Sequence, residues 1–597
     1  MVRVMSIYHF ASQSIQQERI DELSASCLIP DDEIVFARNS DHIIEIRKLS
    51  NLNGSPAGDN SVKSFSSVDD VEQMLYSKVG NFLLTLESRI SNYEKAEITY
   101  VRVYVNWDKQ SSPTQPLRAR IAAKITPMKK TLEMIELPLN YNPSTFAICT
   151  STGNILVAHK NILQLFIFKY CLNETTKLEY IDFFETSFQI ELDFIPSKVL
   201  MNEDVISCCN KQFFHVFKIS ESADGNNSTT SESNMCTSTE VPNTEASVNI
   251  NLDQDVDFQA ICDKSEINGL SFNVKIKSTQ EESMGSLGDD DSEMRPSVVT
   301  DLSAVIKYIN NLPETFALPK KFASQNLLQL KLQSMRISGV LRENVDVFKC
   351  MFMKPLYMKP GIAKCSVSES FFLHSKLRRN FIGCAVLITT QQDGFLYHVN
   401  TNSNESNFLN VYPFTSPVID VFLNDNVLHA LCENGIESYT HRLGQKIFSG
   451  HQNVASVYKN LTQSSSISLV NLRPFMDVHF MIPGDDNLVL MANDSTTPQG
   501  EEPDEIVNWT IYNLKYPTME TIYQDFKEFA DKSLRKYPSV YMNLLEEIHL
   551  MIRFHMALAT LKPEENSEVG NEMKLVWDEC DELLKESSRA LADYFIL

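Results

Sequence analysis

A short two-strand pattern returns along most of this chain and limits the folds that it can adopt. Each copy has a polar turn, an apolar run rich in Ile, Val, Leu and Phe, a second polar turn and a second apolar run. Runs of this kind bounded by tight turns are typical of β-hairpins. The first large part of the chain is therefore predicted to consist mainly of strands. The copies begin at Asp31, Gly80, Gly153, Glu203, Asp393, Asp425 and Asp485.

The spacing of the copies favours one repeated architecture. Where it is regular, successive copies lie about 50 to 70 residues apart, and a four-stranded propeller blade takes about 40 to 50 residues plus its loops. Sheets repeated around an axis also protect their own edges. We therefore predict a degenerate (WD40-like) β-propeller of about seven blades over residues 1–510, with two unrelated β domains as the alternative. No copy carries the Gly-His and Trp-Asp pair of regular WD40 repeats.

One polar segment interrupts the strand pattern. Residues 220–300 are dominated by Ser, Thr, Asn, Glu and Asp, which leaves too little apolar area to offset the entropy of ordering the chain. We expect a mostly disordered insert between blades, with a strand pair at 271–277. Ser283, Ser286 and Ser292 lie beside acidic residues, where an acidophilic kinase could act. A solvated loop without a regulatory role is the favoured interpretation.

The periodicity changes to that of a helix near residue 516. Apolar side chains recur every three or four residues in three segments, which prolines separate. Short breaks between helices predict antiparallel neighbours, as in an α-solenoid. Residues 511–597 are therefore predicted to be the start of an α-helical solenoid, with Pro517 in a first helical turn. We also expect the helices between Met519 and Leu584 to expose an apolar face.

Charge and cysteine usage restrict the environment and the partners. The formal net charge is −24, which disfavours a nucleic-acid surface. The longest apolar stretch, residues 162–168, is far shorter than the ~20 residues of a membrane-spanning helix, and the N-terminus has no signal-peptide core. The 12 cysteines follow no regular spacing, as is typical of reduced thiols. We therefore expect a cytoplasmic protein that does not bind nucleic acid.

Signatures of catalysis are absent from the sequence. It has no phosphate-binding glycine loop, no serine nucleophile elbow and no close-spaced zinc ligands. The pair Glu546-Glu547 is interpreted as a solvated helix face, and the acidic run 289–291 lies in the polar insert. His549 and His555, six residues apart, are placed on different helix faces and are not expected to bind a metal. No catalytic, cofactor-binding or metal-binding residue is therefore predicted.

A propeller followed by helical repeats is instead typical of proteins that dock other proteins. One hypothesis is a trafficking-complex subunit, and a second is a scaffold in another endolysosomal tether or coat. A third, a propeller hydrolase, requires a central channel lined by carboxylates or histidines. The identity of the bound partners would distinguish the first two.

Several stretches, taken in order, resemble one protein family. The chain is similar to the Hermansky–Pudlak syndrome type 3 protein family over most of its length, except in 220–300. Because these are strand and helix stretches, the resemblance lies in their joint order and not in a catalytic signature. They include YVRVYVNWD (100–108), LRARI (117–121), MIELPL (134–139), GNILVAHKNILQLFIFKY (153–170), ISLVNLRPFMDVHFMIPGDDNLVLM (467–491) and LLEEIHLMIRFHMAL (544–558).

The resemblance implies a non-enzymatic subunit of the biogenesis of lysosome-related organelles complex 2. That complex acts in transport from early endosomes to melanosomes, platelet dense granules and insect pigment granules. The implied partners are the type 5 and type 6 proteins of the same syndrome, with a small Rab GTPase as a further candidate. The resemblance also implies a cytoplasmic protein, peripheral on early endosomes and lysosome-related organelles through its partners.

The chain departs from the family at two places. Family members can carry a clathrin-box-like Leu-Leu-Asp-Phe-Glu where this chain has YIDFFE at 180–185. Because Tyr180 replaces the first Leu and an extra Phe precedes Glu185, clathrin binding is not expected. Ile181, Phe183 and Phe184 are interpreted as blade core. Family members also continue well past residue 597, so most of the solenoid is expected to be missing from this chain.

Overall fold

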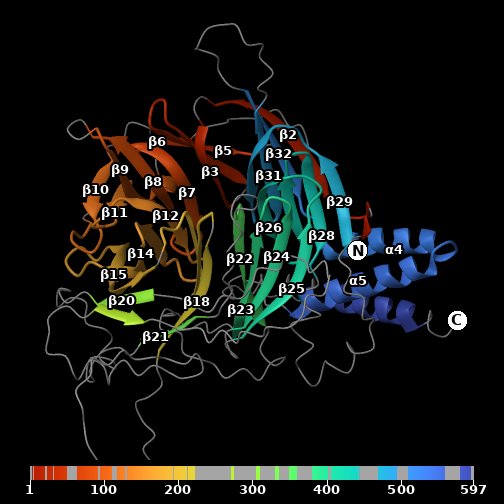
Figure 1. Cartoon of the computed structure of the whole chain (residues 1–597). Coiled ribbons are helices and arrows are strands. Elements are labelled where there is room, and N and C mark those ends of the chain that lie inside the picture. Colours follow the sequence, from red (N-terminus) through yellow and green to blue (C-terminus); the bar gives the residue numbers. More distant parts are fainter. Residues whose placement is uncertain are drawn as a thin grey trace, which may run out of the picture.

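The computed structural model describes most of the predicted propeller and three helical segments. The described ranges are 3–20, 23–49, 63–109, 117–127, 131–221, 348–358, 380–400, 405–441, 468–493, 508–557 and 579–592, with gaps at 5, 31, 92–94, 193 and 212. Three short strands at 271–274, 304–308 and 330–334 and the single residue 443 are also described. The described strands form seven sheets, which follow one another from red to blue in Figure 1.

Each sheet is one blade, and each blade is given from its inner to its outer strand. Blade 1 contains β3 (Leu23–Ile29), β4 (Glu33–Arg38), β5 (Ile43–Lys48) and β6 (Lys63–Ser66). Blade 2 contains β7 (Asp70–Ser77), β8 (Phe82–Ile90), β9 (Glu97–Val105), β11 (Glu133–Glu136) and β10 (Arg118–Ile121), with the 3-10 helix η1 (Trp107–Lys109) after β9. Blade 3 contains β12 (Pro143–Ile148), β13 (Ile155–His159), β14 (Ile162–Leu172), β15 (Glu179–Glu191), β20 (Ala304–Tyr308) and β19 (Ser271–Val274).

The other four blades follow in chain order. Blade 4 contains β16 (Lys198–Asn202), β17 (Val205–Cys209), β18 (Phe214–Glu221) and β21 (Leu330–Ser334). Blade 5 contains β22 (Cys350–Met358), β23 (Asn380–Thr389), β24 (Asp393–Asn400) and β25 (Glu405–Pro413). Blade 6 contains β26 (Val418–Leu423), β27 (Val427–Cys432), β28 (Gly435–Thr440), β29 (Ser468–Pro474) and β1 (Arg3–Val4). Blade 7 contains β30 (Val478–Pro483), β31 (Asn487–Asn493), β32 (Asn508–Lys515) and β2 (Ser12–Arg19).

The inner strands join the blades into a closed ring. Contacts run from β3 to β7, then to β12, β16, β22, β26 and β30, and β30 returns to β3. The N-terminal strand β2 pairs antiparallel with β32 over its full length, from Ser12 opposite Lys515 to Arg19 opposite Asn508. The first long strand of the chain therefore completes the last blade. The predicted seven-bladed β-propeller is confirmed.

The core is divided among the blade interfaces. Seven clusters of buried apolar side chains each fill the space between two neighbouring blades. In β13, for example, Ile155 and Val157 face blade 2, whereas Leu156 and Ala158 face blade 4. Successive side chains of a strand point to opposite faces of its sheet. A middle strand therefore needs an unbroken apolar run, since both of its faces are buried.

Each copy of the sequence pattern falls on one or both of the middle strands of a blade. β13, β17 and β27 are buried along their whole length. The inner strands β7, β26 and β30 instead mix buried with exposed positions. The middle strands therefore gave the visible signal, while the inner and outer strands had to be inferred from the blade size.

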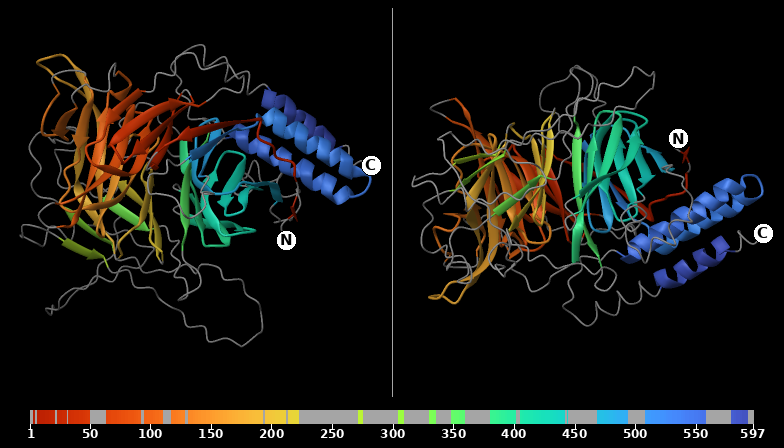
Figure 2. Two further views of the ribbon diagram at one scale, coloured as in Figure 1. Left: turned by 90° about the horizontal axis from the view of Figure 1, so that it is seen from above. Right: turned by 60° about the horizontal axis from the view of Figure 1, so that its bottom comes forward.

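Three helical segments follow the last blade. α4 (Met519–Leu534) begins at Thr518, whose side chain accepts a hydrogen bond from the Thr521 N–H, a usual N-cap arrangement. Pro517 therefore precedes the cap. The prediction that Pro517 lies in the first helical turn was wrong. α5 (Pro538–Ala557) follows, and residues 579–592 are helical. Figures 1 and 2 show the helices packed side by side, away from β8, β9 and β14.

The helices are packed on the propeller and do not stand free. α4 and residues 579–592 share an apolar cluster with Tyr8, Val427 and Val470. α5 lies between this cluster and the core of blades 5 and 6, into which it inserts Leu550 and Phe554. The apolar face predicted to be exposed is therefore buried along the described helices. The large apolar side chains that remain exposed in these helical segments, Leu534 and Tyr537, lie at the α4–α5 turn.

The segment between β18 and β22, which includes the polar insert 220–300, adds strands to two blades; most of the insert lies outside the described residues. β18 ends at Glu221 and β22 begins at Cys350, and between them β20 pairs with β15, β19 with β20, and β21 with β18. β19, at Ser271–Val274, coincides with the strand predicted at 271–277. The three serines considered as kinase targets and the acidic run 289–291 lie outside the described residues.

Candidate docking face

One face of the ring is formed by the connections between blades. A linker joins the fourth strand of each blade, counted from the inside, to the inner strand of the next. The turns between the two middle strands lie on the same face because neighbouring strands run antiparallel. In three blades the first linker N–H donates to a carbonyl of the middle turn. These bonds are Ser67 N to His42 O (2.8 Å), Leu192 N to Asn161 O (2.7 Å) and Phe414 N to Gln392 O (2.7 Å). We call this side of the propeller the linker face.

The helices dock on the opposite face. The turn after β26, which ends away from the linkers, carries Asp425, whose carbonyl lies 2.9 Å from His441 Nε2. His441 packs edge-on against Phe554 of α5, with ring centroids 5.5 Å apart. Lys354 lies 2.6 Å from the Asp425 carboxylate and lowers its pKa. The described helices therefore leave the linker face uncovered.

Large apolar side chains are exposed on several linkers. Val68, Tyr141, Ile195 and Met476 each lie in a different linker, and Ile90 lies at the middle turn of blade 2. Ile90 is 73% exposed, Ile195 62% and Tyr141 46%. Single exposed apolar residues are ordinary, but a group on one face is typical of a protein interaction site.

Three of these side chains belong to one continuous surface over blades 2 and 3. Asn142, beside Tyr141, donates to the carbonyl of Glu97 (3.0 Å), and Glu97 pairs with Ile90. On the other side, the Ser144 hydroxyl donates to the carbonyl of Pro196, beside Ile195 (3.3 Å). We call this surface the blade 2–3 patch; it consists of Arg89, Ile90, Lys95, Glu97, Tyr141, Lys160 and Ile195.

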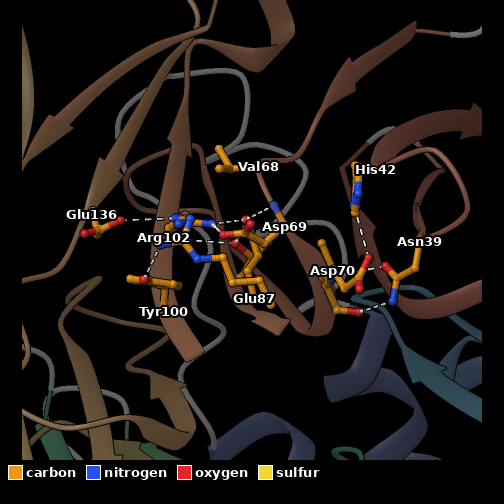
Figure 3. Close-up of polar contacts among 12 residues, drawn as sticks. Asn39, His42, Val68, Asp69, Asp70, Glu87, Tyr100, Arg102 and Glu136 are labelled. Carbon is orange, nitrogen blue, oxygen red and sulfur yellow. Dashed lines mark hydrogen bonds and ion pairs between the residues drawn. The ribbon is translucent and has the colours of Figure 1, made fainter. Parts of the chain in front are cut away.

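A buried ion network holds the linker between blades 1 and 2 (Figure 3). Arg102 of β9 is 3% exposed and lies 2.6 Å from both Asp69 and Glu87, with Glu136 at 3.3 Å. Asp69 belongs to the linker, and its N–H donates to Glu87 at 3.0 Å. Burial lowers the pKa of Arg102, but Glu87 and Asp69 outweigh it and leave the pKa above its ordinary value. Asp69 is therefore fixed through both its backbone and its side chain.

The network continues outward to the blade 2–3 patch. The ring of Tyr100 lies 4.5 Å from the Arg102 guanidinium and 5.1 Å from that of Arg89, whose Nη2 donates to the Tyr100 hydroxyl (2.8 Å). On the other side of the linker, His42 lies 3.1 Å from the Asp70 carboxylate, as Figure 3 shows. Asn39 accepts a hydrogen bond from Val71 N (3.0 Å). These contacts preorganise the side chains at the end of β8.

Blade 6 contains a related arrangement without an arginine. Glu437, 1% exposed, accepts from the linker N–H of Thr415 (3.0 Å) and from the Tyr439 hydroxyl (2.6 Å). Burial, reinforced by Glu437, raises the pKa of Tyr439. Both buried glutamates hold a linker, so their role is structural. Sequence reasoning missed them, although a single Glu inside FLLTLES and GIESYT is a visible signal.

Burial shifts the pKa of several described thiols and histidines. No group of three or more His, Cys, Asp or Glu residues in the described ranges could hold a metal ion. Burial raises the pKa of Cys209 to about 11 and of Cys350 to about 12, so these thiols are not nucleophilic thiolates at neutral pH. Burial also lowers the pKa of His398, His441 and His549 to about 4. These histidines are therefore neutral core residues.

One expectation about a carboxylate pair was wrong. Glu546 and Glu547 are 4% and 2% exposed, whereas a solvated helix face had been predicted. The reason is that α5 is covered on two sides, by the propeller and by the neighbouring helices. His549 is also buried and lies 2.9 Å from the Ser587 hydroxyl, and the half-buried His555 has no part in a described metal cluster.

The clathrin-box-like segment is part of a blade. Residues 180–185 lie within β15, Asp182 is bound by Arg120 at 2.9 Å, and Phe183 is fully buried. Arg120 also donates to the carbonyl of Ile181 (2.8 Å). The interpretation of Phe183 as blade core agrees with this burial, while Ile181 and Phe184 are half-buried. A linear motif must be free to enter its receptor, and this segment is paired and anchored.

Comparison with known proteins now gives the family. The family model for the Hermansky-Pudlak syndrome 3 protein, N-terminal, matches residues 3–300. This chain belongs to the HPS3 family. The mouse protein "BLOC-2 complex member HPS3" is 30% identical over 137 residues, which are 22% of this chain and 13% of that protein. The human protein of the same name is 31% identical over 137 residues, with the same coverage.

The match to these HPS3 relatives is limited in length, and the matching solved structures are distant. The chain covers 13% of the length of the curated relatives that it matches. The AfRom2 CNH domain (9% identity, TM-score 0.31) and the WD40 repeats of RRP9 (7% identity, TM-score 0.34) each cover 86% of this chain, and 99% and 100% of their own chains. At such TM-scores neither supports an argument about this HPS3-family chain. None of its described helices is long and apolar enough to cross a membrane.

Proposed function

We propose that this chain is a non-enzymatic subunit of the biogenesis of lysosome-related organelles complex 2. The observation that carries the proposal is membership of the HPS3 family, whose mouse and human members are named as members of that complex. In this role the chain acts in transport from endosomes to lysosome-related organelles, including pigment granules. Its partners are the type 5 and type 6 Hermansky–Pudlak syndrome proteins, with a Rab GTPase as a further candidate.

The structure supports a docking role in two ways. The linker face exposes apolar side chains, and the buried ion pairs of Arg102 with Asp69 and Glu87 hold one of its linkers in place. Buried thiols and histidines such as Cys350 and His441 have pKa values moved away from neutrality, unlike catalytic acids and bases. The chain acts in the cytoplasm and reaches endosomes through its partners. The proposed division is a propeller over residues 1–510 and the start of a helical solenoid over 511–597, with the last propeller strand, β32, running on to Lys515.

Purification from cells tests the proposal. The chain is tagged at its endogenous locus, and bound proteins are identified by mass spectrometry. Recovery of the type 5 and type 6 proteins in stoichiometric amounts is the expected result. A chain recovered alone, or with the subunits of a different endolysosomal tether, would contradict the proposal.

A full-length chain is needed for this test. A truncation before β32 removes the strand that pairs with both β31 and β2. A truncation before α5 removes Leu550 and Phe554 from the core of blades 5 and 6. Either truncation would lose partners through misfolding. Point substitutions on exposed residues are therefore the appropriate variants.

A further inference from the structure

We infer that the blade 2–3 patch is the docking site for a partner segment in which apolar residues are flanked by acidic ones. The inference rests on the proposed function, since it takes the partner to be another subunit of the same complex. The patch combines an apolar centre, a positively charged margin and a rigid frame. Each of these properties comes from described residues.

The apolar centre is formed by side chains from three separate connections. Ile90 ends β8, Tyr141 lies in the linker between blades 2 and 3, and Ile195 lies in the linker between blades 3 and 4. The bonds from Asn142 to Glu97 and from Ser144 to Pro196 hold these connections side by side. Exposed aromatic and aliphatic anchors held in place in this way are typical centres of protein interfaces.

Tyr141 is ordered before any partner binds. The Lys160 ammonium lies 3.6 Å from the centroid of the Tyr141 ring, and the His159 ring lies 5.8 Å from it on a buried strand. A side chain that is already fixed loses less conformational entropy on binding. Tyr141 is therefore suited to act as an anchor.

The charge of the patch sets the chemistry of the partner. Among its described residues, Arg89, Lys95 and Lys160 are exposed cations, and Glu97 is the exposed anion. The half-buried Glu191, which lies 3.4 Å from Asn161 beside Lys160, reduces the excess to one positive charge among these described residues, on a chain whose net charge is −24. Complementary charge at an interface margin selects partners and speeds association. An acidic segment with apolar anchors satisfies both parts of the patch.

Two sets of substitutions test the two parts separately. The charge variant is Lys95→Glu with Lys160→Glu, and the apolar variant is Ile90→Ser with Ile195→Ser. The matched control is Leu172→Ser with Lys177→Glu, which changes one exposed apolar and one exposed basic residue of blade 3 near the turn on the opposite face. The full chain is co-expressed with the type 5 and type 6 proteins, and thermal unfolding checks that each variant folds like the wild type.

The expected result is that both patch variants bind the partners at least tenfold more weakly, while the control binds like the wild type. Raising the salt concentration from 0.1 to 0.5 M should weaken wild-type binding but strengthen binding by the charge variant, because screening reduces the repulsion between its new glutamates and the acidic partner. A photo-crosslinking amino acid at position 195 should capture a partner peptide rich in Asp or Glu and in apolar residues.

The outcomes separate this inference from the proposed function. If the wild type binds no type 5 or type 6 protein, the proposed function fails. If the wild type binds and both patch variants bind equally well, the inference fails and the proposed function stands. Capture of a basic segment, or of a second copy of this chain, would also overturn the inference. Flotation of the wild type, but not the charge variant, with phosphatidylserine vesicles would assign the patch to a membrane instead.

Discussion

Blades 2 and 6 both fix a linker with a buried glutamate, but they neutralise the glutamate differently. In blade 2, Glu87 lies 2.6 Å from the Arg102 guanidinium. In blade 6, the hydrogen bonds described for Glu437 come from the neutral donors Thr415 and Tyr439. Neutral donors are therefore enough to hold a linker. Arg102 has an additional role in blade 2, because its guanidinium also pairs with Asp69 and Glu136 and lies over the ring of Tyr100.

Removal of the arginine should have the largest effect. Arg102→Met leaves Asp69 and Glu87 buried without their cation, and breaking a buried ion pair from one side costs about 3 to 5 kcal/mol. Urea unfolding of the full chain measures this loss. Adding Glu87→Gln to Arg102→Met should recover part of it. A loss below about 1 kcal/mol would show that blade 2 needs its arginine no more than blade 6 does.

Neutralising Asp204, a buried carboxylate whose cation is more distant, should stabilise the protein, whereas removing Arg102 should destabilise it. Asp204 is buried, Lys218 lies 3.8 Å away, and burial raises the pKa of Asp204 to about 6. Between pH ~4 and ~6 the native state holds more protons than the unfolded chain, so Asp204 lowers the stability as the pH rises through this window. Asp204→Asn should therefore stabilise the protein by about 1 to 2 kcal/mol at pH 7.5.

The pH dependence provides the control for Asp204. At pH 4.5 the native carboxyl is protonated but the unfolded one is still largely ionised, so the advantage of Asp204→Asn should be much smaller, and it should disappear only below pH ~4. Thermal midpoints of the wild type and the variant at both pH values measure the difference. Equal stabilisation at pH 4.5 and 7.5 would indicate a packing effect and not a charge effect.

Replacing Glu87 and Glu437 by glutamine should lower the free energy of unfolding by different amounts. Glu437→Gln keeps an oxygen for the Thr415 N–H and leaves no cation behind, so we expect a loss of about 1 kcal/mol. Glu87→Gln removes one of the charges that face Arg102, so we expect about 2 kcal/mol. The comparison is made by urea unfolding of both variants at pH 7.5. Equal losses would mean that the arginine contributes nothing through its charge.

The smallest effect on stability is expected on the linker face itself. Ile90→Ser with Ile195→Ser changes side chains that are 73% and 62% exposed, so the free energy of unfolding should change by less than about 0.5 kcal/mol. Thermal unfolding checks this value. A large loss would show that the patch supports the blades, as Glu87 and Glu437 do, and is not a free surface.

The fold was predictable where a strand is buried on both faces. The apolar runs of β13, β17 and β27 identified their blades because each run faces two interfaces. β2, with the sequence SQSIQQER, gave no such signal. It is an outer strand held mainly by backbone hydrogen bonds, which any sequence can form. The closure of the ring was therefore not predictable from hydrophobic pattern alone.

The candidate site was less predictable than the fold. Ile90, Tyr141 and Ile195 lie far apart in the sequence, and only the order of the blades brings them together. The burial of Glu546 and Glu547 was missed because a helix pattern shows the helix's own faces and not what covers them. The buried Glu87 was more accessible to prediction, since an isolated acid within an apolar strand needs a partner.

The pairing of β2 with β32 has a consequence for synthesis on the ribosome. Ser12 is made 503 residues before Lys515, its partner in the last blade. At about 5 to 20 residues per second, the first strand waits roughly 25 to 100 s before its partner emerges. Throughout that interval blade 7 is incomplete and the ring cannot close, so the nascent chain offers open strand edges to chaperones. The first long strand to be made is therefore among the last to pair.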